Sequence, residues 1–317
     1  MTDKIRVTVL GSGAMGSFYG ATFQDAGCDV LLLDIWKEHI NKLNDAGLEM
    51  TSPDGKTRIV SVSATPVEKE GVRAADLVIV FVDTNALDDV LPRIESLLAP
   101  GGVVLTLQNG VGNLEKLSDA LGRERVIAGT SMNSCELTAP GKIRHVIHGE
   151  TTIGEIGGEE ISERIHKIGN ILSQVDDKIE LVADIVPHVW SKLIINCAIN
   201  PLCALTGLLP GELQEHADTR KLQQDIVAEI VALCDRKGIH LPELDPIAEV
   251  WLKSRGSANK PSMVQHLERG RQTEINALNG AVVRMALEVG VSVPANATVT
   301  SLIKGLEDGK GIDFQLN

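Results

Sequence analysis

Short runs of apolar and β-branched residues alternate with helical patterns over the first half of the chain. The clearest of these runs occupy residues 5–10, 30–34, 77–82 and 103–107. This alternation is typical of a parallel sheet whose strands are joined by crossover helices. The first half is therefore predicted to be a doubly wound α/β domain.

Two later apolar runs, Lys142–Ile147 and Thr151–Ile156, are separated by a short polar break. We expect them to form an antiparallel hairpin that closes the sheet. His145 and His148 stand three apart on a predicted strand, so strand alternation should turn them to opposite faces. No metal site is predicted there or elsewhere in the sequence.

From Pro187 to Leu306 nearly every segment has helical periodicity. Turn-forming residues interrupt this periodicity at Thr206–Pro210, Gly238–Pro246 and Gly290–Pro294. The change of pattern predicts two domains, with residues 1–184 containing the sheet and residues 185–317 made only of helices.

A glycine-rich turn lies between the first predicted strand and the first predicted helix. Its residues are Gly11, Ser12, Gly13, Ala14, Met15 and Gly16. Gly11 allows a tight turn, Gly13 lets a pyrophosphate approach the backbone, and Gly16 lets the helix pack closely on the strand. Because free N–H groups at a helix start bind phosphate, the turn predicts a cofactor site of the Rossmann type.

The second predicted strand ends at Asp34, which is followed by Trp36 and Lys37. A carboxylate at this position accepts hydrogen bonds from a ribose 2′-hydroxyl and repels a 2′-phosphate. Since the next residues offer one cation and no arginine, NAD(H) is predicted in preference to NADP(H). Trp36 could stack on adenine or could be ordinary surface packing, and the sequence favours neither.

The chain has 317 residues, enough for two domains, and a net charge of −13. This charge argues against a nucleic-acid partner, because phosphates bind clustered cations. The five cysteines show no C-x-x-C spacing and are expected to be reduced thiols. With no signal peptide and no apolar run of membrane-spanning length, we expect a cytoplasmic protein without a membrane partner.

Polar residues also follow two other predicted strands. Asp83 ends the run at 77–82, and Asn109 lies just beyond the run at 103–107. Ligands of such sheets bind beyond the carboxyl ends of the strands. Asp83 and Asn109 are therefore expected to line one crevice with the glycine turn and to contact the cofactor.

Lys192, Asn196 and Asn200 are spaced four apart within an otherwise apolar stretch, so they share one face of a helix. A buried lysine is costly to keep charged unless a partner or a reaction uses it. Either Lys192 extends to the surface, with the asparagines as caps, or it is a proton donor. Desolvation lowers a lysine pKa toward neutrality, and this favours the proton donor.

Pro261 is suited to the first turn of a helix. Asn259 and Ser262, on either side of it, are then either helix caps or an anion-binding site.

The same stretch contains a four-residue spacing, through Ser262, His266, Gly270 and Glu274. One helix face is expected to carry these residues. Glu274 could orient a substrate hydroxyl or pair with Lys192. His266 could be a catalytic base, but a histidine on a helix is more often a structural group.

Four stretches together resemble a known family, namely GSGAMG at 11–16, LQNGVGN at 107–113, WSKLIINCAINPLCALTG at 190–207 and PSMVQHLERGRQTEINALNGAVV at 261–283. They resemble the ketopantoate (2-dehydropantoate) 2-reductases over nearly the whole chain. The resemblance implies a Rossmann domain followed by an all-helical domain, with the substrate bound between them.

The resemblance also implies roles for single residues. Lys192 would be the general acid that protonates the nascent alkoxide, and Glu274 would hold the substrate or the lysine in position. The other ligand-binding residues would be Asn196 and Asn200 in the pocket, Asn259 and Ser262 on the substrate carboxylate, and Asn109 beside the cofactor. The long apolar helices suggest a homodimer.

Four positions depart from the family pattern. Lysine is usual at Asp83, aspartate at His266, a substrate-contacting asparagine at Pro210, and arginine at Asp34 in NADP-dependent members. A change from lysine to aspartate alters the local charge by two units, which an anionic substrate would feel. Asp83 and His266 are then either an exchanged acid–cation pair or the sign of a substrate with a cationic or hydroxyl-rich side chain.

The sequence therefore predicts NAD(P)H-dependent reduction of a small anionic 2-oxo acid, with His266 among the substrate-binding residues. By resemblance the reaction would be ketopantoate to pantoate, in pantothenate biosynthesis. Alternatives are an NAD-dependent dehydrogenase of another hydroxy acid and a catalytically silent NAD(H) sensor. The set Lys192, Asn196 and Glu274 argues against the sensor.

Overall fold

The computed structural model describes residues 4–257 and 259–309, and the chain forms two compact units. Asn113–Ile185 and the residues up to Gln108 make up the first unit, and the residues from Val186 onward belong to the second. The segment Asn109–Gly112 groups with the second unit, although its neighbours in sequence belong to the first. The division after Ile185 falls beside the boundary that the sequence predicts.

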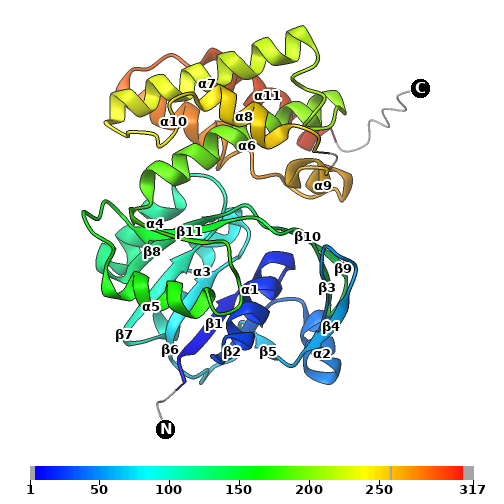
Figure 1. The fold of residues 1–317 in the computed structure, drawn as a ribbon, viewed down its shortest axis with the longest axis vertical. Helices are drawn as coiled ribbons and strands as arrows, with labels where there is room; N and C mark the ends of the chain where they lie inside the picture. Colours follow the sequence, from blue (N-terminus) through cyan, green and yellow to red (C-terminus); the bar gives the residue numbers. More distant parts are fainter. Residues whose placement is uncertain (1–3, 258, 310–317) are drawn as a thin grey trace. The chain divides into compact units, whose positions relative to one another are not determined.

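An eight-stranded sheet forms the framework of the first unit, in the order β12-β11-β8-β7-β6-β1-β2-β5 (Figure 1). Its strands are β1 Arg6–Leu10, β2 Asp29–Asp34, β5 Ser63–Pro66, β6 Ala75–Val80, β7 Leu98–Thr106, β8 Val126–Ser131, β11 Thr151–Glu155 and β12 Ile179–Asp184. Neighbouring strands pair in parallel except β11 with β8, which are antiparallel. The predicted α/β class is confirmed.

Helices cover both faces of this sheet. They are α1 Ala14–Asp25, α2 Lys37–Ala46, α3 Leu87–Leu97, α4 Asn113–Leu121 and α5 Glu163–Leu172, with short 3₁₀ turns η1 Thr84–Ala86 and η2 Arg123–Arg125. One core contains side chains of α1, α2 and α5, and another contains those of α3 and α4. Strand β1 supplies Val9 to the first core and Leu10 to the second. Continuous apolar runs are expected of parallel strands, because both of their faces are buried.

The predicted hairpin is wrong, because its two strands lie in different sheets. A second sheet has the order β4-β3-β10-β9 and consists of β3 Leu48–Thr51, β4 Thr57–Val60, β9 Ser134–Ala139 and β10 Lys142–Ile147. Strand β10 pairs with β9 and β3, whereas β11 joins the large sheet. Strand β11 is buried over Thr151–Gly154, which suits a strand inside the large sheet, where β8 and β12 pair with its two edges.

The small sheet also explains why α1 has no polar face. Helix α1 contacts strands of the small sheet as well as β1 and β2 of the large one. Its residues Gly16–Phe23 are all buried. A helix that is apolar all round is a core helix, so its amphipathic signal is weak.

The second unit is made only of helices in its described part, as predicted. They are α6 Val186–Thr206, α7 Ala217–Lys237, α8 Pro246–Ser254, α9 Ser262–Glu268, α10 Asn279–Val289 and α11 Pro294–Asp308. Helix α6 is central, because α7, α8, α9 and α11 all contact it. All five cysteines of the chain are free thiols, as expected.

The expectation that no apolar run reaches a membrane-spanning length is wrong for α6. Its 21 residues and mean hydropathy of 1.3 would suffice, although 56% of that window is buried inside the unit. Apolar residues all round are also what a central core helix needs.

Buried His39 on α2 supports the glycine turn, a role that no sequence pattern predicts. The Gly141 N–H donates to His39 Nδ1 at 3.0 Å, so the ring proton is on Nε2, 3.3 Å from Ser17 Oγ. Ser17 Oγ donates in turn to the Ser12 carbonyl at 2.7 Å. Burial lowers the pKa of His39, and protonation of Nδ1 would break the bond from Gly141.

His39 should make the folded state less stable in mild acid. Below about pH 6.5 the unfolded chain binds a proton that the folded chain does not, so the free energy of unfolding falls as the pH drops. His39→Asn keeps an acceptor near Nδ1 and does not titrate. We expect it to lose less stability than the parent between about pH 7.5 and about pH 5.5 in urea unfolding. An equal loss, or the same effect of His166→Asn on exposed His166, would contradict this role.

Candidate active site

The glycine turn has the geometry that its sequence predicts. Gly11 has φ +90° and donates its N–H to the Leu33 carbonyl at 2.8 Å. A Cβ on Gly16 would lie 1.8 Å from the Gly11 carbonyl oxygen, so helix and strand need glycine there. These two glycines are explained by the packing of the protein itself.

Gly13 is different. A Cβ on it would meet no atom of the described chain within 4 Å, and its φ of −59° is open to any residue. Gly13 is the N-cap residue of α1, and no side chain caps this helix start. Open space beside uncapped N–H groups fits a diphosphate, which these N–H groups would bind. Ser12, Ala14 and Met15 are the neighbours of Gly13 in the sequence, and α1 begins at Ala14.

Asp34 is held at the end of β2 by the turn. Its Oδ2 accepts from Ser12 N at 2.6 Å and Ser12 Oγ at 3.0 Å, and its Oδ1 accepts from Trp36 N at 2.9 Å. Oδ1 can accept one further bond, so a ribose hydroxyl fits here. The Trp36 ring stacks on His39 at 5.4 Å, which gives it a packing role and fixes its plane.

Asp83 has a structural partner. It is exposed, and its Oδ1 accepts from Asn85 N at 3.1 Å, which caps the 3₁₀ turn η1. The neighbouring Val82 carbonyl accepts from Gln108 Nε2 at 2.8 Å. Gln108, which the sequence analysis missed, therefore ties the ends of β6 and β7 together.

Helix α6 carries Lys192, Asn196 and Asn200 on one face, as the spacing predicts. Burial lowers the pKa of Lys192 to about 8, and the negative charge of Glu274 opposes this shift. Asn200 is 7% exposed, deep in the core. Asn196 and Asn200 lie inside α6 rather than at its ends, so the idea that they are caps is wrong.

Glu274 binds polar side chains from two other segments of the second unit. Its Oε2 accepts from Asn109 Nδ2 at 3.2 Å and from Ser262 Oγ at 3.3 Å. Asn109 is held here because Val111 N donates to the Ala277 carbonyl at 3.2 Å. Asn109, predicted beside the cofactor, thus also contacts the acid that faces Lys192.

The single helix face predicted for residues 262–274 is wrong. Helix α9 ends at Glu268, and Gly270 follows with φ +62°. A residue in this left-handed region ends the helix, so the chain turns and brings Glu274 back to Ser262. Spacing alone could not show this return.

The two cap candidates behave differently from caps. No side chain caps the start of α9, and the Ser262 hydroxyl is directed to Glu274 instead. Capping by Ser262 is therefore wrong. Asn259 is exposed in the segment that leads into α9.

Two buried polar atoms of the candidate site have no hydrogen-bond partner in the described part of the chain. They are Asn196 Nδ2 and His266 Nδ1. A buried polar atom without a partner is costly, so such an atom often marks the place of a ligand. Both residues belong to the predicted substrate-binding set.

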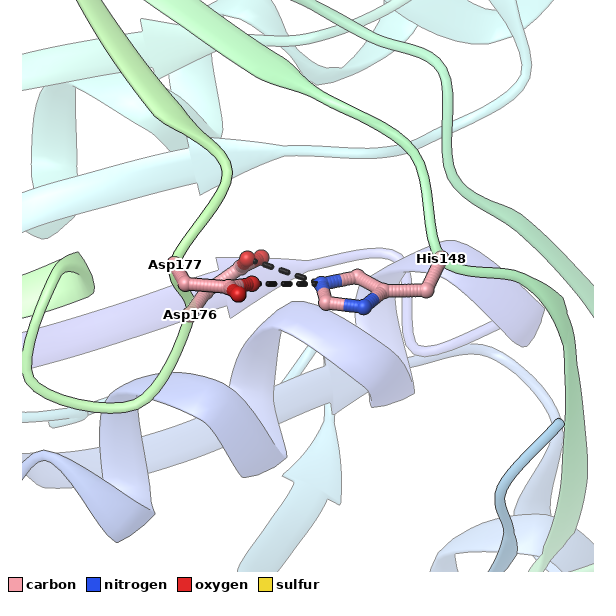
Figure 2. Close-up of side chains that lie close together, drawn as sticks. All are labelled: His148, Asp176 and Asp177. Carbon is pink, nitrogen blue, oxygen red and sulfur yellow. Dashed lines mark hydrogen bonds and ion pairs between the residues drawn. The ribbon is translucent and has the colours of Figure 1, made fainter. Parts of the chain in front are cut away.

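His148 and two aspartates form a separate cluster in the first unit. Figure 2 shows His148 facing Asp176 and Asp177, with His148 Nε2 2.9 Å and 3.7 Å from their Oδ1 atoms. Asp176 Oδ1 also accepts from Lys178 N at 2.9 Å, which suits a histidine–aspartate hydrogen bond between two loops. The group could hold a metal by distance, yet these bonds already account for its geometry.

The prediction that His145 and His148 face opposite sides is also wrong. Their ring centroids are 5.8 Å apart. The pairing of β10 is irregular between His145 and Ile147, and the strand ends at Ile147. His148 therefore does not follow the strand alternation.

The features of the first unit are those of Rossmann-type dinucleotide-binding proteins. Two family models match the chain, "Ketopantoate reductase PanE/ApbA" over residues 7–158 and "Ketopantoate reductase PanE/ApbA C terminal" over residues 184–307. The 2-dehydropantoate 2-reductase of Halobacterium salinarum is 32% identical, over 95% of this chain and 98% of that protein. The enzyme of the same name from Pyrococcus abyssi is 28% identical, over 97% and 99%.

Solved structures agree. A D-mandelate dehydrogenase with NADH and anilino(oxo)acetate is similar with a TM-score of 0.88 at 26% identity, over 96% of this chain and 99% of that one. A PanE/ApbA family ketopantoate reductase from Ralstonia eutropha JMP134 has a TM-score of 0.85 at 30% identity, over the same shares. The chain therefore belongs to the ketopantoate reductase family, as its four motif stretches predict.

Gly13 and Gly16 make a matched pair for testing the turn. Gly16→Ala should destabilise the protein by about 3 kcal/mol or more, because its methyl group would overlap the Gly11 carbonyl. Gly13→Ala should keep the parent's stability but weaken NADH binding at least about tenfold, because the methyl group fills the diphosphate space. Urea unfolding and NADH fluorescence titration measure the two effects. Parent-like NADH binding by Gly13→Ala would show that the space holds no phosphate.

Proposed function

We propose that this protein reduces a small 2-oxo acid to the 2-hydroxy acid with NADH. The observation that carries the proposal is Lys192 on α6, a partly buried lysine whose desolvation lowers its pKa to about 8, against the opposing charge of Glu274. A lysine poised in this range can donate a proton at neutral pH and recover it from solvent. Membership in a family of oxidoreductases acting on CH–OH groups supports the same reaction class.

In the proposed step a hydride adds to the carbonyl carbon, and the carbonyl oxygen takes a proton from Lys192 Nζ. Bound NADH supplies the hydride. The C=O π bond becomes a C–H and an O–H bond, so the 2-oxo acid becomes a 2-hydroxy acid and neutral Lys192 remains. Protonated Lys192 also stabilises the charge that develops on the oxygen, which a buried site makes effective.

Glu274 keeps Lys192 protonated in this proposal. Its charge raises the pKa of Lys192 against the effect of burial, which keeps a useful fraction protonated. Its Oε2, bonded to Asn109 and Ser262, is held in place by both. Asn259 and Asn196 would bind the substrate carboxylate and oxygen atoms, because amide N–H groups are donors that anions accept, whereas the one hydroxyl proton of Ser262 is donated to Glu274.

The cofactor choice rests on Asp34. Its carboxylate ends β2 beside the glycine turn, and its bonds to Ser12 and Trp36 leave Oδ1 able to accept from one ribose hydroxyl. A 2′-phosphate would meet a like charge there. We therefore favour NAD(H) over NADP(H).

The substrate side chain is the finer part of the proposal. Ketopantoate is favoured by the family, and the relatives from Halobacterium and Pyrococcus carry the name of that activity. A second candidate is the oxidation of another 2-hydroxy acid, supported by the similar D-mandelate dehydrogenase. Pro210 lacks the side-chain amide of the asparagine that is usual there. At His266, where aspartate is usual, a buried Nδ1 atom without a hydrogen-bond partner among the described residues takes the place of a carboxylate. Both departures favour a side chain other than that of ketopantoate.

A panel of 2-oxo acids that includes ketopantoate and phenylglyoxylate tests the reaction. We expect loss of NADH absorbance with at least one acid, and Lys192→Ala should lower kcat at least about a hundredfold while NADH still binds. Because protonated Lys192 is the acid, kcat should be level below about pH 8 and fall about tenfold per pH unit well above it. NADH binding without turnover of any acid would favour the sensor, and near-full turnover of Lys192→Ala would end the mechanism.

The same assay with both cofactors tests Asp34. The parent should have the higher kcat/KM with NADH. Asp34→Ser removes the charge that would repel a 2′-phosphate. It should raise the ratio of kcat/KM with NADPH to kcat/KM with NADH by about tenfold or more, which corresponds to about 1.4 kcal/mol. As a control, Asp29→Ser at the opposite end of β2 should leave the ratio unchanged. A parent that prefers NADPH would refute the assignment.

A further inference from the structure

Helix α6 contains a proline in its interior, and this leaves a backbone group without its normal partner. Pro201 has no N–H to donate to the carbonyl four residues earlier, which is that of Cys197. Cys197 is 0% exposed, so water does not reach this part of the helix. A buried carbonyl needs another donor.

Asn279 supplies that donor. Its Nδ2 donates to the Cys197 carbonyl at 3.2 Å, and its side chain is 0% exposed. Asn279 is the first residue of α10 and lies 82 positions from Cys197 in the sequence. The gap that Pro201 opens in one helix is therefore closed by the start of another.

The start of α10 is joined directly to Glu274. The N–H groups of Ala277 and Leu278 donate to the Glu274 carbonyl at 2.9 Å and 3.1 Å. Asn279 follows immediately. The bond to Cys197 thus connects the helix that carries Lys192 with the turn that carries Glu274.

The side chain of Asn279 is itself anchored. Its Nδ2 also donates to Asn296 Oδ1 at 3.0 Å, and Asn296 Nδ2 donates to Glu229 Oε2 at 2.8 Å. The Glu229 carboxylate accepts in addition from the N–H groups of Ala295 and Asn296, at the start of α11. A network with this many shared members fixes each orientation, so Asn279 does not swing away cheaply.

We propose that Asn279 is a positioning residue for Lys192 and Glu274, and that it acts by completing helix α6 where Pro201 interrupts it. This role rests on the proposed reduction of a 2-oxo acid by the same site. Without the bond, α6 and the turn before α10 separate or slide. Glu274 then opposes the effect of burial on the pKa of Lys192 less strongly, and that pKa falls.

A double-mutant cycle tests the link. In the parent background, Asn279→Ala should lower kcat about tenfold or more, since a misplacement of 1 Å can cost roughly a hundredfold. KM should change less, because Asn279 is 0% exposed and is out of reach of a bound ligand. The alkaline limb of the kcat profile should move to lower pH. In the Pro201→Ala background, residue 201 donates to Cys197 itself, so Asn279→Ala should have a much smaller effect.

Gln223→Ala is the matched control. Gln223 is also 0% exposed and donates to α6, at the Ala198 carbonyl at 3.2 Å, but from α7 rather than from the Glu274 turn. It should lower stability without moving the pH profile. If Asn279→Ala does not fold alone, the Pro201→Ala background provides the comparison, because there the fold has its donor back.

The pKa of Lys192 can be read without turnover, by NMR titration of ¹³C-labelled lysine with the resonance assigned through Lys192→Arg. A lower pKa in Asn279→Ala, restored by adding Pro201→Ala, supports the proposal even if no 2-oxo acid is reduced. An unchanged Lys192 pKa, or the same shift in Gln223→Ala, overturns it. Failure of the reaction with an intact pKa effect would instead refute the proposed function.

Discussion

The candidate site depends on the desolvation of one ammonium group. Lys192 lies on a helix that is apolar nearly all round, and burial there lowers its pKa to about 8. The fixed charge of Glu274 limits that shift. A buried charge is tolerated only when such a partner is held close, so the positions of α6 and of the Glu274 turn are coupled. The packing of the helical unit can be understood as the means of holding these two segments together.

The sheet unit meets a different constraint, which is to keep one small volume free. Gly11 and Gly16 are needed for packing, whereas Gly13 has space beside it that no described atom fills. Asp34 accepts a hydrogen bond from Ser12, the residue before Gly13. Buried His39 lies within hydrogen-bond distance of Ser17, whose hydroxyl donates to the Ser12 carbonyl. A glycine turn that is already held in place need not rearrange to accept a diphosphate, so binding costs little conformational entropy.

Asp83 and His266 mark where this member of the family differs. Asp83 caps a short turn in one unit, and His266 presents a buried unpaired Nδ1 in the other. The contacts of Asp83 and of His266 are each explained within their own unit. The exchanged-pair hypothesis and the different-substrate hypothesis therefore remain predictions, and they differ in which acid the site should prefer.

Local patterns were enough to predict the α/β class, the glycine turn, the shared face of Lys192, Asn196 and Asn200, and the family. These features depend on spacing within one strand, turn or helix. The four-stranded sheet, the return of Glu274 to Ser262, the support from His39 and the bond from Asn279 to Cys197 join residues far apart in sequence. Periodicity carries no information about such partners, because packing in three dimensions selects them. The sequence by itself thus determined which chemical groups are present, and only the tertiary structure decided which of them meet.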